Sequence, residues 1–144
     1  MKTVLDPGTR QELEARAGAL TPGHAARWGR MDATRMLAHC SQGLRMATGD
    51  LVLRHSPARL IGWMFKALAT NDRPFQRNAP TAPELKVPEP AAFEAERDRF
   101  LATLATVADG LAVRVHPFFG RLDREQWGKL VYKHVDHHFQ QFGV

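Results

Sequence analysis

The chain has 144 residues, of which 44% are hydrophobic and 24% charged, a composition typical of a globular protein with its own core. Its single cysteine, Cys40, excludes an internal disulfide framework and a zinc site built from several cysteines. The formal charge of +5 comes from basic residues scattered along the chain, without a block of like charge. This dispersion argues against a nucleic-acid-binding surface.

The chain has no segment typical of a membrane protein. Its richest apolar stretch, residues 60–69, contains Lys66 and is far shorter than the roughly 18 residues of a membrane-spanning helix. The first residues lack the long apolar core of a secretory signal. We therefore expect a soluble, cytoplasmic protein that forms one domain over residues 1–144.

Helical periodicity dominates, and each of the first two predicted helices has a start signal. Asp6 followed by Pro7 is typical of an N-cap and first helical position, and predicts a helix that ends between residues 17 and 20. Asp32 is the predicted N-cap of a second helix, which runs through His39 to Gly49.

A third helix is predicted to begin at Ser56 and Pro57, the same start signal again. Its residues Trp63, Met64 and Phe65 make it apolar on more than one side. Either a homodimer interface or burial within one chain would explain this pattern.

Residues 71–90 contain five prolines, which prevent a persistent helix. Because neither flanking part is long enough to be an ordinary independent domain, we expect a long ordered crossover within one bundle. A fourth helix is predicted over residues 91–108, with Gly110 near its end.

The final part of the chain is predicted to contain a compact apolar loop and a long helix. The loop covers residues 115–120. The helix begins at Asp123, because Gln126 stands at the capping-box position three residues later.

Two histidines of this last helix share one face. At about 100° per residue, His134 and His138 project from the same apolar stripe as Trp127, and His137 lies to one side. Their Cβ atoms are expected to be about 6 Å apart, so one metal ion can bridge the two imidazoles. Val135 stands where a zinc protease helix has its glutamate, which disfavours a metalloprotease.

The second helix offers a third ligand, because His39 also projects from an apolar face. Three histidines from two helices would hold a divalent ion and leave a coordination position open, as catalytic sites require. The alternative for each of them is a hydrogen-bonded core histidine without a metal.

Other residues are candidates for the surroundings of this site. His137 is interpreted as a supporting or surface residue, and Arg35 as a partner for an anionic cofactor or as a solvated helix flank. We interpret Trp28, Met36 and Trp127 first as packing residues and second as parts of a pocket wall. Cys40 is interpreted as a small buried residue. His24, His55 and His116 are expected in loops or near helix ends, without a catalytic role.

Two segments, residues 27–39 and 132–142, resemble the DinB-like superfamily of metal-binding helical bundles, and within it a small uncharacterised-domain branch. In that superfamily, a tryptophan precedes the helix that bears the first ligand histidine. A late helix then carries two more ligand histidines, four residues apart, followed by a glutamine. The resemblance implies His39, His134 and His138 as ligands, with Gln140 or Gln141 as the trailing glutamine. It also implies an up-down-down-up four-helix bundle, often dimeric, that binds zinc, nickel or a similar ion.

Characterised members of the superfamily include metal-dependent transferases that use bacillithiol, mycothiol or glutathione, and a thiol-dependent isomerase. The resemblance thus favours a metal-dependent thiol S-transferase or related enzyme acting on a small molecule, and the same site could activate water instead. A non-catalytic metal-binding or stress-associated interaction protein is the alternative. A cavity beside the metal would favour the enzyme. The chain departs from the superfamily in its proline-rich crossover and in Val135, where glutamate is frequent.

Overall fold

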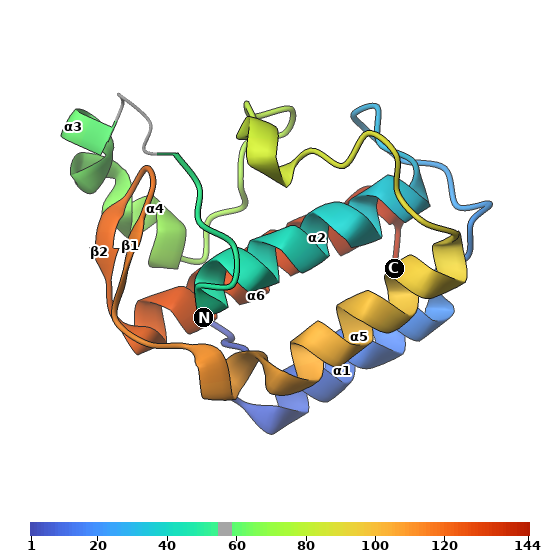
Figure 1. Cartoon of the computed structure of the whole chain (residues 1–144), viewed down its shortest axis with the longest axis horizontal. Coiled ribbons are helices and arrows are strands. Elements are labelled where there is room, and N and C mark those ends of the chain that lie inside the picture. Colours follow the sequence, from blue (N-terminus) through green and yellow to red (C-terminus); the bar gives the residue numbers. More distant parts are fainter. Residues whose placement is uncertain (55–58) are drawn as a thin grey trace.

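Four long helices form the body of the molecule (Figure 1). They are α1 (Pro7–Ala19), α2 (Ala33–Thr48), α5 (Phe93–Gly110) and α6 (Arg124–Phe142) in a computed structural model that describes residues 1–54 and 59–144. Helices α1 and α6 run in one direction and α2 and α5 in the other. The predicted all-α class and the up-down-down-up bundle are confirmed.

The helix ends are where their capping residues predict them. The side chains of Asp6, Asp32 and Asp123 each accept a hydrogen bond from a backbone N–H in the first turn of α1, α2 and α6. Helix α6 has the complete capping box with Gln126. Gly49 ends α2 with a φ of 88°, a left-handed conformation that glycine adopts without strain.

The core lies where α2 packs against α5 and α6, and α1 packs against the same two helices. Its largest fully buried side chains include Trp127, Phe100, Phe139, Met36 and Leu104. Phe100 of α5 meets Phe139 of α6 edge to face, with ring centroids 5.6 Å apart. The two helices that carry the candidate histidines are therefore anchored by an apolar core.

The predicted third helix is present over residues 59–70, but it is divided into three short segments. Its expected start at Ser56 and Pro57 lies outside the described residues, and the following chain forms α3 (Arg59–Gly62), a 3-10 turn (Trp63–Phe65) and α4 (Lys66–Thr70). A Cβ on Gly62 would stand 1.9 Å from the carbonyl oxygen of Phe118, so the chain passes directly against the backbone of the next hairpin. This long-range contact is invisible to a local pattern.

The proline-rich crossover is ordered as predicted, and holds one 3-10 turn over Pro83–Leu85. It runs along α2 (Figure 1). The crossover is therefore close enough to contribute to the site that α2 carries.

The predicted apolar loop at residues 115–120 is instead a small hairpin. Strand β1 (Arg114–His116) pairs antiparallel with β2 (Gly120–Leu122). Nδ1 of His116 accepts hydrogen bonds from the backbone N–H groups of Phe118 and Phe119, at 3.0 and 3.1 Å, and so closes the turn. Strands of three residues are too short for an alternating pattern to reveal.

Several apolar side chains near α3 and α4 are exposed, among them Met64 and Phe65. Homodimerisation through this surface stays a prediction. None of the helices that the structure describes combines the length and the apolar character needed to cross a membrane.

Candidate metal centre

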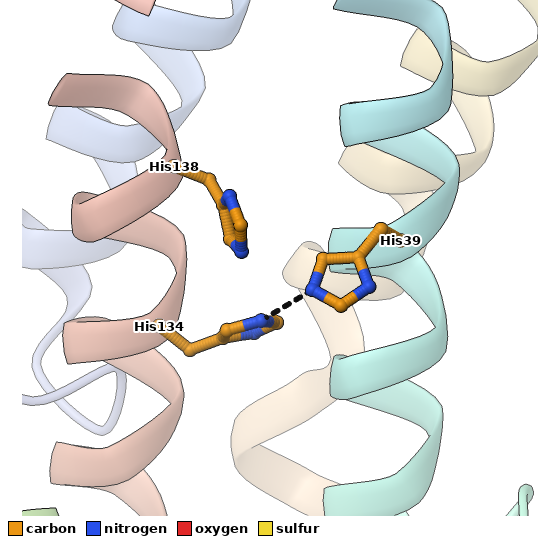
Figure 2. Close-up of side chains that lie close together, drawn as sticks. All are labelled: His39, His134 and His138. Atoms are coloured by element: carbon orange, nitrogen blue, oxygen red, sulfur yellow. Dashed lines mark hydrogen bonds between the residues drawn. The ribbon is translucent and has the colours of Figure 1, made fainter. Parts of the chain in front are cut away.

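Three histidines meet between α2 and α6, and we call them the His cluster: His39, His134 and His138 (Figure 2). His134 and His138 extend from α6 toward His39 on α2. Nε2 of His39 lies 2.8 Å from Nε2 of His134, and one ring nitrogen from each of the three lies within 4.8 Å of the others. The structure thus brings together all three predicted ligands.

The outer nitrogens of two of these rings are held by acceptors. Nδ1–H of His39 donates to the carbonyl oxygen of Leu85 in the crossover, at 2.9 Å. Nδ1–H of His138 donates to Oε1 of Gln141, also at 2.9 Å. The amide of Gln141 is oriented in turn, because its Nε2 donates to the carbonyl oxygen of Trp28 at 2.6 Å.

These bonds decide which nitrogen can bind a metal. A carbonyl oxygen only accepts, so Nδ1 of His39 and of His138 carries the proton. A neutral imidazole has one N–H, and the lone pair of each ring is therefore on Nε2. Histidines that bind metals typically have their other N–H held in this way.

Gly43 makes room for the third ring. A Cβ at this position of α2 would lie 2.8 Å from both Cε1 and Nδ1 of His134. Glycine within a helix costs roughly 0.5–1 kcal/mol relative to alanine. In return, the imidazole of His134 can lie directly against the backbone of α2.

Burial keeps the His cluster uncharged. Loss of solvent lowers the pKa of His39 and, together with the neighbouring imidazoles, lowers the pKa of His134 well below its ordinary value. For His138 the same two causes lower the pKa to about 3. All three rings are therefore neutral at pH 7, which is the form that binds a metal.

The donor set fits a divalent ion. Three nitrogens bound tetrahedrally to zinc at 2.0–2.1 Å lie about 3.3 Å apart, so small side-chain adjustments would suffice. No carboxylate or thiol within the described ranges joins the group. Three protein ligands leave a fourth position for an exchangeable molecule.

A cavity of about 150 Å³ opens beside the His cluster, and we call it the His134 cavity. His134 forms part of its wall, together with residues of α2, the crossover, the hairpin and the first half of α6. A ligand in this cavity would therefore lie next to one of the three candidate metal ligands.

Trp28 and His137 lie beside the His cluster without joining its nitrogens. Their ring centroids are 5.6 Å apart, and the guanidinium of Arg77 covers the Trp28 ring at 4.1 Å. His137 also contacts the rings of His138 and Phe75. Trp28 supports the centre through its backbone carbonyl, which orients Gln141.

The remaining candidates divide between core, surface and cavity. Met36 is buried next to Cys40, whose thiol has its pKa raised by burial and lies 3.6 Å from the Met36 sulfur. Arg35 is exposed, pairs with Asp32 and donates to the carbonyl oxygen of Pro88. Trp127 is buried and lines the His134 cavity.

Three supporting features escape the sequence analysis or are left open by it. The carbonyl of Leu85 comes from the crossover, whose path no local pattern predicts. The trailing glutamine at the centre is Gln141, whereas Gln140 is exposed and bonds Asp136. His116 was expected in a loop or near a helix end without a catalytic role; it ends strand β1 instead and lines the His134 cavity. His55 lies outside the described residues.

A four-helix bundle with three histidines on two facing helices defines the class of protein: a helical bundle with a candidate metal centre. Residues 9–143 match the family model described as "Protein of unknown function (DUF1569)", and the chain belongs to this family. No curated protein and no solved structure shows a significant match to the chain. The match confirms an uncharacterised family, and the wider DinB-like relationship stays a prediction.

Proposed function

We propose that this protein binds zinc or nickel through His39, His134 and His138 and uses it to transfer a low-molecular-weight thiol to an electrophilic small molecule. The observation that carries the metal site is the convergence of the three rings, with the Nδ1–H of two of them already donated elsewhere. A hydrogen-bonded core histidine needs no such arrangement with two others.

The uncharged ligand set favours an anionic partner. Three neutral imidazoles leave the charge of a divalent ion uncompensated, so a thiolate or hydroxide is attracted to the remaining position. The ion would supply Lewis acidity, which lowers the pKa of a coordinating thiol or water and makes a nucleophile at neutral pH. His39 and His138 would keep their Nε2 lone pairs toward the ion through Leu85 and Gln141.

The His134 cavity supports catalysis over the non-catalytic alternative. A purely structural metal is normally enclosed by four protein ligands. Here three histidines lie together and one of them forms part of the wall of a cavity. The choice of a thiol such as bacillithiol, mycothiol or glutathione is supported by the resemblance to the DinB-like superfamily.

Thiol transfer can be tested with 1-chloro-2,4-dinitrobenzene as the electrophile. The thiol sulfur forms a bond to the ring carbon, chloride leaves with the electron pair of its bond, and the thiol proton passes to the buffer. We expect the metal-loaded protein to accelerate this reaction with at least one of the three thiols. The acceleration should disappear after chelation of the metal and in His138→Ala.

His24→Ala is the matched control, because His24 lies in a surface turn and bonds Thr21. It should keep the full rate. Acceleration that survives chelation, or that persists in His138→Ala, would contradict the proposal. Metal-dependent hydrolysis of p-nitrophenyl acetate without any thiol reaction would replace the thiol by water as the nucleophile.

A further inference from the structure

The His134 cavity has an uncharged wall. Phe119, Leu130 and Val131 are among its apolar lining residues, and none of the residues that line it is Asp, Glu, Lys or Arg. A charged group would lose its hydration there without gaining a paired side chain, at a cost of several kcal/mol. The wall therefore selects against ligands that place a charge in the cavity.

The size of the cavity sets the size of its ligand. A volume of about 150 Å³ is comparable to that of a buried apolar cavity known to admit benzene. A single six-membered ring therefore fits in this space.

Two residues that line this cavity, His116 and Trp127, each carry an N–H group in the side chain. The Nδ1 of His116 accepts from two backbone N–H groups, so it carries no proton, and the neutral ring has its N–H at Nε2. Burial lowers the pKa of His116 to about 4, which keeps the ring neutral at pH 7. The Nε1–H of Trp127 is buried and has no acceptor among the described residues.

We propose that the His134 cavity binds an uncharged, single-ring apolar group that bears a hydrogen-bond acceptor, such as a carbonyl oxygen, and that His116 is its specificity-determining donor. The inference deepens the proposed function and rests on it, because the cavity then holds the apolar part of the electrophile next to His134. His116 would bind the acceptor, while the apolar wall would exclude water from the ring.

The proposal can be tested by ¹⁹F NMR titration of three probes. They are 4-fluoroacetophenone, which has a ring and an acceptor; fluorobenzene, which has the ring alone; and 4-fluorobenzylammonium, which carries a charge. The first should bind about two- to tenfold more tightly than the second, as one hydrogen bond provides. The charged probe should show no saturable binding.

Two variants locate the binding. Leu130→Phe adds volume to the cavity wall and should remove saturable binding of both neutral probes. His116→Asn retains an acceptor for the hairpin amides but lacks Nε2–H, so it should weaken 4-fluoroacetophenone to the level of fluorobenzene. Val113→Phe is the matched control, because Val113 is half-exposed and does not line the cavity.

The metal content of each sample separates this inference from the proposed function. His39→Ala should lose the metal and still bind 4-fluoroacetophenone, whereas Leu130→Phe should keep the metal and lose the probe. A wild-type protein that binds the probe but no metal would overturn the proposed function while the ligand class of the cavity stands. A metal-loaded wild type that binds neither neutral probe, or prefers the charged one, would overturn the inference.

Discussion

Helices α5 and α6 have 18 and 19 residues and both contribute to the same core, yet they bury polar side chains in different ways. In α5 the buried polar residue is Glu96, which accepts from the backbone N–H of Ala91 and pairs with Arg99. Its partners lie within five residues of the chain. Glu96 is therefore explained by the start of its own helix.

Helix α6 buries Lys133, His138 and Gln141, whose partners include distant segments. Lys133 bonds oxygen atoms of Leu68 and Asn71 and so attaches α4 to the bundle. His138 differs from both Lys133 and Glu96. Of its two ring nitrogens, only Nδ1 has a hydrogen-bond partner that holds the side chain in place. A buried polar side chain is thus a candidate for function where one of its nitrogens faces the ring nitrogens of other histidines instead of a hydrogen-bond partner.

Acid should destabilise the metal-free protein, since the imidazoles beside α6 are buried uncharged. For His138 and His116 the folded pKa values of about 3 and 4 lie below the unfolded value near 6.5. The unfolded chain therefore binds more protons as the pH falls below 6.5. We expect the free energy of unfolding to drop by about 3–4 kcal/mol between pH 6 and pH 4.5.

Urea unfolding at the two pH values measures this drop. His138→Phe, which keeps a ring in place, should remove roughly half of the pH dependence. Equal stability at both pH values would mean that the imidazoles are not buried in their neutral form.

In α5 the substitution with the largest expected effect changes core packing and leaves the candidate metal centre intact. Phe100→Ala removes a fully buried ring and should lower the free energy of unfolding by about 3–5 kcal/mol. The metal affinity of the folded variant, measured by competition with a chelator, should stay within about twofold of the wild type. A large loss of metal affinity would show that the two helices do not divide these roles.

In α6 the corresponding change acts on the metal. Gln141→Leu removes the acceptor of His138 Nδ1–H and the bond to the carbonyl of Trp28, and should weaken metal binding by about 10- to 100-fold. Gln140→Leu is the matched control on the exposed side of the helix and should leave the affinity unchanged. Chelator competition on both variants decides whether orientation of His138 matters.

A pair of glycine variants makes the smallest change in structure. Gly43→Ala places a methyl group against the His134 ring and should weaken metal binding by about tenfold, the equivalent of ~1.4 kcal/mol. Gly18→Ala in α1 meets no atom within 4 Å and should stabilise the fold by about 0.5–1 kcal/mol without affecting the metal. If Gly43→Ala binds metal normally, the ring of His134 does not need this space.

Structural features could be predicted from the sequence where the interactions that cause them are local. The N-caps at Asp6, Asp32 and Asp123 act within one turn, so helices α1, α2 and α6 were correctly predicted. The helical wheel also placed His39, His134 and His138 on inward faces, because only the helix period is needed. Their meeting required the additional inference that α2 and α6 face each other, for which the superfamily resemblance was the guide.

The features that sequence analysis missed depend on contacts between distant segments. Gly62 lies against the backbone of Phe118, and the predicted third helix is divided into pieces at this point of the chain. The carbonyl of Leu85 reaches His39 only because the crossover folds over α2. His116 gains a place in the cavity wall because the hairpin turns toward α6, where its ring lies 5.4 Å from that of Trp127.

The most direct test of the account is the metal content of protein purified without a histidine tag, compared between the wild type and His134→Ala. Near-stoichiometric zinc or nickel is expected in the wild type and its loss in the variant, with helical content retained in both. A wild-type protein that contains no metal and takes up neither ion when it is supplied would contradict the account. The three histidines would then be packed core residues of a helical bundle.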